Sequence, residues 1–181
     1  VTQPRPSGAK KLAELKAQDG LYTQLIRGLK NGQPIEEIEI IAVFNAMIDP
    51  YLEWERFMAL ADEPELQVVV SNTTEAGLRY IETAWTSQQP VESFPAKLTL
   101  LLYRRFETFG GDTSRGLIML PCELLERNGD TLKACVLQHA DDWHLPETFK
   151  QWVISHNRFL NSLVDRIVTG YPADDAEALF D

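Results

Sequence analysis

The chain has 181 residues, enough for one domain that buries roughly 70% of its unfolded surface. Its 17 Lys and Arg residues against 27 Asp and Glu residues leave a net charge of −10, and no basic cluster is longer than a pair. Nucleic acid and anionic membranes are poor partners for such a surface, and we expect neither. The longest apolar run is far shorter than the roughly 20 residues that span a bilayer.

Cysteine and histidine usage indicates a reduced protein without a metal site. Cys122 and Cys135 are the only cysteines, and no CxxC or Cys/His metal spacing occurs. The first residues lack the apolar segment of a signal peptide. We therefore expect a cytoplasmic protein that binds no metal.

The first half of the chain predicts a helix, a β-hairpin, a second helix and a buried strand. A helical pattern over 9–17 follows the breaker cluster at 4–8. Two β-rich runs, 21–29 and 34–44, flank Asn31-Gly32, which is a strong hairpin signal. The remaining elements are a helix that begins at Asp49-Pro50 and a strand over 67–72.

The second half predicts three helices and a further strand. Ser93 and Pro95 open a helix with a leucine stripe, which Gly110-Gly111 ends. An apolar strand over 117–120 follows. The remaining elements are a helix capped by Asp130, a long helix from Pro146 through Leu163, and a short β-branched stretch over 164–168.

Strands that alternate with helices, and that are apolar on both faces, indicate a mostly parallel sheet covered by helices. Ligands of such sheets bind beyond the carboxyl ends of the strands. The polar stretch 71–77, SNTTEAG, directly follows one predicted strand, and 121–129, PCELLERNG, follows another. Either stretch alone is more often an ordinary loop with turn and cap residues, and only their shared position favours a ligand site.

Five segments carry a resemblance to a known family: QDGLYTQLIRGL, SNTTEAG, SFPAKLTLLLYRRF, LIMLPCELLERNG and LVDRIVTGYP. In this order they resemble the tagaturonate reductases, bacterial enzymes of the long-chain mannitol dehydrogenase family. The resemblance covers nearly the whole chain, and the combination is much more specific than any one motif. It implies NAD-dependent, metal-free interconversion of D-tagaturonate and D-altronate in hexuronate catabolism.

The resemblance also implies that residues 1–181 form only part of a dinucleotide-binding domain. In the family, an N-terminal strand and glycine-containing loop hold the cofactor pyrophosphate, and no G-x-G-x-x motif occurs here. The family's catalytic Lys, with a following Asn and His, lies in a later helical domain that nothing after Val168 resembles. We therefore expect an α/β fold, a mostly parallel Rossmann-like sheet with flanking helices and a β-hairpin insertion, incomplete at both ends. Apolar surface left exposed would favour self-association.

Four positions match functional residues of the family. The resemblance places Thr74 and Glu75 against the cofactor, near its nicotinamide half. It assigns Asn128 to polarising the substrate oxygen, because a neutral N–H donor stabilises the alkoxide that forms there. It assigns Asp165 to the polyol pocket. Turn chemistry is the alternative for Asn128, and an ion pair with Arg166 is the alternative for Asp165.

The residues alone decide neither the cofactor nor the substrate. An acidic residue often binds the adenosine ribose at the strand end near Val1, but Thr2, Gln3 and Arg5 occur there instead, so NAD rather than NADP rests on the resemblance. The resemblance implies a small-molecule substrate, a uronate or ketose, with fructuronate or mannitol as alternatives to tagaturonate. A non-catalytic α/β module that binds a nucleotide or a protein is the alternative from another class.

Overall fold

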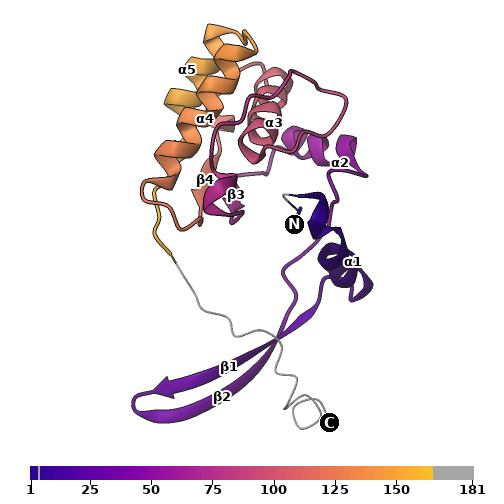
Figure 1. Cartoon of the computed structure of the whole chain (residues 1–181), viewed down its shortest axis with the longest axis vertical. Coiled ribbons are helices and arrows are strands. Elements are labelled where there is room, and N and C mark those ends of the chain that lie inside the picture. Colours follow the sequence, from indigo (N-terminus) through magenta and orange to yellow (C-terminus); the bar gives the residue numbers. More distant parts are fainter. Residues whose placement is uncertain (4, 165–181) are drawn as a thin grey trace.

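The computed structural model describes residues 1–3 and 5–164 (Figure 1). Helices and strands alternate along the chain, as the sequence predicts. The α-helices are α1 (Ala9–Ala17), α2 (Trp54–Met58), α3 (Phe94–Thr108), α4 (Asn128–Asp142) and α5 (Glu147–His156). The strands are β1 (Tyr22–Lys30), β2 (Gln33–Ile41), β3 (Val68–Ser71), β4 (Ile118–Pro121) and β5 (Arg158–Phe159). Short 3₁₀ helices connect them: η1 (Pro6–Gly8), η2 (Ala59–Asp62), η3 (Glu75–Gly77) and η4 (Thr113–Arg115).

The strands β3, β4 and β5 form a parallel sheet in the order β3-β4-β5. Val69 pairs with Met119, which pairs in turn with Phe159. A separate parallel bridge joins Thr2 to Ile48. The predicted α/β class with a mostly parallel sheet is therefore confirmed.

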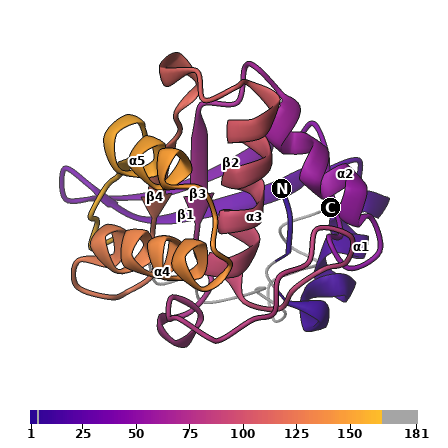
Figure 2. The same ribbon diagram turned by 90° about the horizontal axis from the view of Figure 1, so that it is seen from above.

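Helices α3, α4 and α5 lie over one face of this sheet (Figures 1 and 2). Met119 points into the core beneath them and is fully buried, together with Leu102, Val136 and Phe149. The sequence analysis predicted that helices cover both faces of the sheet, and this prediction is wrong for β3. Val70, on the face opposite the helices, is 63% exposed.

Helix α3 follows the sequence signals closely. The hydroxyl of Ser93 accepts a hydrogen bond from the backbone N–H of Ala96, which caps the first turn. The chain leaves the helix through Gly110 and Gly111, both with positive φ. Arg105, near the end of this helix, is buried and donates to the backbone carbonyls of four residues: Ala61, Glu63, Leu66 and Arg115.

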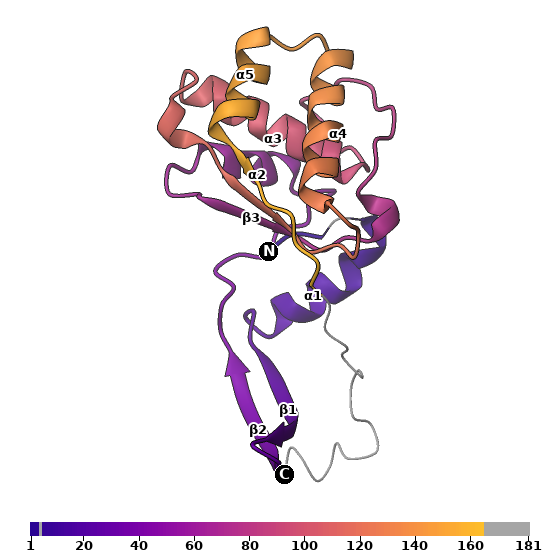
Figure 3. The ribbon, with the colours of Figure 1, turned by 90° about the vertical axis from the view of Figure 1, so that its left-hand side faces the viewer.

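The hairpin β1–β2 forms as predicted and extends away from the sheet and helices (Figure 3). Asn31 and Gly32 have φ values of 53° and 78°, the backbone that a two-residue type I′ turn requires. Large apolar side chains on the hairpin remain exposed, including Leu29 at 75% and Ile40 at 73%.

The last helix was predicted to continue through Leu163, and this prediction is wrong. Helix α5 ends at His156, and the chain then enters β5 beside β4. Asn157 makes this change possible, because its side chain donates to the Trp152 carbonyl and accepts from the Leu117 backbone N–H. Pairing with a distant strand therefore outweighs the helical spacing of the sequence.

Helix α4 also begins differently from the prediction, which made Asp130 its cap. The helix starts at Asn128, after Arg127 in the left-handed conformation (φ 56°). Gly129 lies against the backbone beyond β5, where an added Cβ would stand 2.5 Å from the Leu160 carbonyl oxygen. This glycine therefore permits close packing of α4 on the segment after β5.

Candidate functional site

The carboxyl ends of β3 and β4 lie side by side, because the strands are parallel and Ser71 pairs with Pro121. The pairing continues one residue further, since the Cys122 backbone N–H donates to the Ser71 carbonyl at 2.7 Å. The loops 72–77 and 122–127 therefore leave the same edge of the sheet. Parallel α/β sheets bind their ligands at this edge.

Glu123 connects these two loops. Its side chain is buried, and its carboxylate accepts hydrogen bonds from the Ser71 hydroxyl at 3.1 Å, the Thr73 hydroxyl at 3.0 Å and the Thr73 backbone N–H at 2.9 Å. These donors offset the cost of burying a carboxylate. The sequence analysis gave Glu123 no role, although a carboxylate three residues beyond the predicted apolar strand 117–120 was a usable signal.

Thr74 and Glu75, the predicted cofactor residues, lie at the start of η3. The Thr74 hydroxyl accepts from the Gly77 backbone N–H at 3.0 Å and from Arg5 Nη2 at 2.8 Å. Glu75 is exposed. Both line a shallow hollow of about 420 Å³, together with Asn72, Ala76, Glu123 and Leu124. The cofactor roles of Thr74 and Glu75 stay predictions.

Asn128 is fully buried at the start of α4. Its Nδ2 donates to the carbonyls of Pro121 and Glu123, at 3.0 Å each, and its Oδ1 accepts from the Ser162 backbone N–H at 3.0 Å. The amide therefore joins the loop after β4 to the segment after β5. Its catalytic role stays a prediction. Asp165, the predicted substrate residue, lies outside the described residues.

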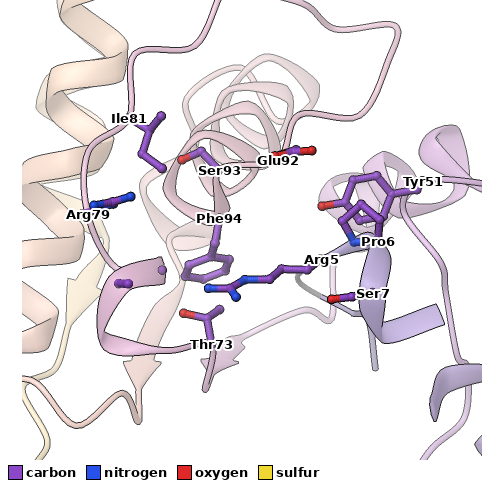
Figure 4. A pocket seen from close by; sticks show the side chains of 12 residues that line it. Arg5, Pro6, Ser7, Tyr51, Thr73, Arg79, Ile81, Glu92, Ser93 and Phe94 are labelled. Atoms are coloured by element: carbon purple, nitrogen blue, oxygen red, sulfur yellow. The ribbon is translucent and has the colours of Figure 1, made fainter. Parts of the chain in front are cut away.

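A second pocket, of about 430 Å³, lies between the segment after Thr2, the loop after β3 and the start of α3 (Figure 4). Its volume falls in the range of roughly 300–1,000 Å³ that small-molecule sites occupy. Two guanidinium groups, one carboxylate, several hydroxyls and apolar rings line it: Arg5, Pro6, Ser7, Tyr51, Thr73, Ala76, Gly77, Arg79, Ile81, Glu92, Ser93 and Phe94. Of these residues, the sequence analysis placed Thr73, Ala76 and Gly77 in a loop that faces a ligand, and it named Arg5 at the strand end near the adenosine ribose.

A buried lysine supports one wall of this pocket. Lys97 Nζ donates to the Tyr51 hydroxyl at 2.7 Å and lies 4.5 Å from the centre of the Tyr51 ring. Burial lowers the pKa of Lys97 to about 8, against the opposing effect of Glu92 and Asp49. Burial, followed by the same two carboxylates, raises the pKa of Tyr51 to about 12. The Tyr51 hydroxyl therefore stays protonated near neutral pH.

Neither a metal site nor a membrane-spanning helix occurs among the described residues. Within 1–3 and 5–164, no group of three or more His, Cys, Asp or Glu side chains is arranged to hold a metal ion. No helix in that part of the chain combines the length and hydropathy needed to cross a membrane.

Comparison with known proteins places the chain in a family. Residues 8–180 match the family described as the mannitol dehydrogenase Rossmann domain. The chain belongs to the mannitol dehydrogenase family. Altronate oxidoreductases of Yersinia enterocolitica and Escherichia coli are each 47% identical to it over 166 residues, or 91% of this chain. The matches cover 34% of each relative, so the chain spans about a third of their length.

Two solved structures share the fold. Pseudomonas fluorescens mannitol 2-dehydrogenase, in a ternary complex with NAD and D-mannitol, matches with a TM-score of 0.75 and 20% identity over 97% of this chain and 37% of that chain. A substrate-free D-sorbitol dehydrogenase matches with a TM-score of 0.71 and 22% identity over 96% and 37%. These structures confirm the predicted Rossmann-like fold. The family match and the altronate oxidoreductases confirm the predicted resemblance to the long-chain mannitol dehydrogenase family.

Proposed function

We propose that this chain is a segment of an NAD-dependent oxidoreductase that interconverts D-tagaturonate and D-altronate. The observation that carries the proposal is the 47% identity to altronate oxidoreductases over 91% of the chain. The mannitol and sorbitol dehydrogenases, at 20% and 22% identity, support the fold alone. The family's oxidoreductases give no support to a non-catalytic module.

The two hollows at the end of β3 fit the two halves of a dinucleotide. They lie on either side of the loop 72–77 and share Ala76. The pocket of about 430 Å³ offers the apolar side chains of Ile81 and Phe94 for an adenine ring and the hydroxyl of Ser7 for a ribose. The hollow beside Glu75 would receive the nicotinamide half. Bound NAD would supply the hydride acceptor or donor.

The protein's own residues would then position the cofactor and the substrate oxygen. Thr74 and Glu75 would contact the cofactor, and Glu123 holds their loop against the end of β4. Asn128 would donate to the substrate oxygen and stabilise negative charge there. Because Pro121 and Glu123 accept both hydrogens of its amide, this role requires one of these bonds to open when substrate binds. Asp165 would accept hydrogen bonds from substrate hydroxyls.

A cytoplasmic location agrees with two free cysteines, Cys122 and Cys135, in the part of the chain that the structure describes.

A reductase assay of the intact gene product tests the proposal. The substrates are D-tagaturonate, D-fructuronate and D-fructose, each with NADH and NADPH. We expect the highest kcat/KM with D-tagaturonate. A higher value with D-fructuronate or D-fructose would reassign the substrate, and no turnover with any pair would refute the proposal. The 181-residue chain alone should show no turnover, because it carries neither the glycine loop nor the catalytic lysine region of the family.

A further inference from the structure

His139 differs from the other buried side chains of α4. It is fully buried in the last turn of the helix, and neither ring nitrogen has a hydrogen-bond partner among the described residues. Buried polar atoms are nearly always paired, because an unpaired one costs free energy. The imidazole lies between two aromatic rings, with its centre 4.8 Å from that of Tyr80 and 5.0 Å from that of Trp143.

Tyr80 and Trp143 also fasten the segment 79–90 to α4. This segment runs in an irregular conformation from η3 to α3. The Tyr80 hydroxyl donates to Asp142 Oδ2, and the indole N–H of Trp143 donates to the Thr83 carbonyl at 2.7 Å. The two rings that enclose the buried histidine are therefore the same rings that attach the segment.

Tyr80 connects this attachment to the pocket of about 430 Å³. Its chain neighbours Arg79 and Ile81 both line that pocket (Figure 4). A displacement of Tyr80 must move these two lining residues, because they are covalently joined to it. The wall of the pocket therefore depends on how firmly α4 holds Tyr80.

Protonation would change what His139 needs from its surroundings. An imidazolium carries two N–H donors, and neither nitrogen has an acceptor among the described residues. Burial lowers the pKa of His139 below its usual value, against the attraction of Asp142. The faces of the two aromatic rings and the C-terminal end of α4 add to that attraction, but they supply no acceptor. Release of the segment would expose the imidazole to water and remove the penalty.

The ionisable groups around this histidine lie on three elements: Asp142 and Cys135 on α4, Tyr80 and Glu82 on the segment, and Tyr103 on α3, which reaches the cluster through Trp85. The hydrogen bond to Asp142 raises the pKa of Tyr80 to about 12, so its hydroxyl stays a donor at neutral and mildly acidic pH. Burial raises the pKa of Cys135 and that of Tyr103. Histidine is the side chain whose ordinary pKa falls between pH 5 and 8, so His139 is the group that responds in this range.

We propose that the segment 79–90 is an acid-sensitive cover: protonation of His139 releases it from α4 and thereby opens one wall of the pocket. Neutral His139 keeps Tyr80 and Trp143 in place. Below about pH 6.5, the ordinary pKa of an exposed histidine, each further pH unit favours the released segment by up to about tenfold. The inference goes beyond the proposed function and uses neither its cofactor nor its substrate.

Hydrogen exchange of the intact gene product tests the inference. The protection of backbone amides is measured by mass spectrometry in peptides from 79–90 at pH 7.5 and 5.5, with correction for the intrinsic pH dependence of exchange. Protection should be roughly tenfold lower at pH 5.5, the factor for uptake of one proton by a group with a pKa of about 6.5. Peptides from α3 and α5 should keep their protection.

His139→Phe is the decisive variant, because it keeps an aromatic ring between Tyr80 and Trp143 but binds no proton. Its protection over 79–90 should differ by less than about twofold between the two pH values. At pH 7.5 it should equal or exceed that of the wild type, because two unpaired polar atoms are removed. His156→Gln is the matched control, since His156 is exposed at the end of α5, and it should keep the tenfold step.

Tyr80→Phe is a second test that leaves the buried histidine in place. It removes the bond to Asp142, so protection over 79–90 should be lower than in the wild type at both pH values, with the same step between them. Unchanged protection in this variant would show that Tyr80 does not hold the segment, and this overturns the inference.

Three further results would also overturn it. The first is equal protection of the wild type at both pH values. The second is a step that persists in His139→Phe. The third is a loss of protection at pH 5.5 that is equally large in α3 and α5, which would show a general loosening of the fold. The reductase assay with uronates is independent of these outcomes, so the proposed function can fail or hold separately.

Discussion

Replacing Asn128 by Ala should lower the free energy of unfolding by about 3 kcal/mol. The side chain is fully buried, and its removal leaves the Ser162 backbone N–H without its partner, which costs roughly 1–3 kcal/mol. The Glu123 carbonyl loses one of its two hydrogen bonds, because the Leu125 backbone N–H also donates to it, and a lost bond of this kind costs about 0.5–1.5 kcal/mol. The Pro121 carbonyl is less affected, because the Ser162 hydroxyl also donates to it. For a domain of this size, the loss corresponds to a melting temperature lower by roughly 10 °C.

The Asp variant at this position should be less stable than the Ala variant. It would bring a carboxylate oxygen to the place where the amide nitrogen now meets the carbonyls of Pro121 and Glu123. Three oxygens would then face one another in a buried site, where the Ser162 hydroxyl can donate its one hydrogen to only one of them.

Asn161→Ala serves as the control for Asn128. Asn161 also joins the segment after β5 to α4, through two hydrogen bonds to Asp130, but it is exposed to solvent. Its loss should cost less than about 1 kcal/mol. Thermal and urea unfolding of the three variants check these values. A melting temperature of Asn128→Ala within about 2 °C of the wild type would refute the assignment of this amide as a structural link.

Turnover separates the structural role of Asn128 from the proposed catalytic one. In the intact enzyme, measured well below the melting temperature of the variant, Asn128→Ala should reduce kcat by roughly a hundredfold, with cofactor affinity retained. A destabilised variant with normal kcat would remove Asn128 from the catalytic site.

Three further predictions concern stability and association. Burial lowers the pKa of Lys97 to about 8, so the unfolded chain binds more protons than the folded chain between pH 8 and 10. The free energy of unfolding of the wild type should therefore rise by roughly 2 kcal/mol over this interval, relative to that of Lys97→Met, in urea unfolding. Equal pH dependence of the two proteins would contradict this prediction. Gly129→Ala should lower the free energy of unfolding by about 2–3 kcal/mol, because the new Cβ would meet the Leu160 carbonyl. Gly28→Ala should lower it by less than about 1 kcal/mol, because the new Cβ would meet open space. Similar melting temperatures of the two variants would refute this prediction. The 181-residue chain should self-associate through the exposed face of β3, and Val70→Lys should weaken association; a wild-type monomer in sedimentation at high concentration would count against this.

The sequence predicted those elements whose signals are local. Asn31-Gly32 contains the turn geometry of the hairpin within two residues, and Ser93 caps α3 through a bond to Ala96, three residues away. The end of α5 depends on a contact that spans 40 residues, from Asn157 to Leu117, and no pattern near position 157 reveals it. Distant strand pairing therefore accounts for the wrong boundary.

The candidate site was predictable in part for the same reason. The rule that ligands bind beyond parallel strands identified the loops 71–77 and 121–129 from sequence alone. The contacts that organise the site span greater distances, since Thr73 binds Glu123 across 50 residues and Thr74 binds Arg5 across 69. Residue type at one position does not specify a partner so far away, so the role of Glu123 and the contact between Arg5 and Thr74 required the fold.

The hairpin β1–β2 has a consequence for the fate of the chain in the cell. A two-stranded ribbon is marginally stable by itself in water, and this one exposes Leu29, Ile38 and Ile40. Chaperones and proteases that survey unfinished proteins recognise such extended apolar segments. A copy whose hairpin is uncovered would therefore present these apolar side chains to such proteins while the helices beside the sheet are still folded.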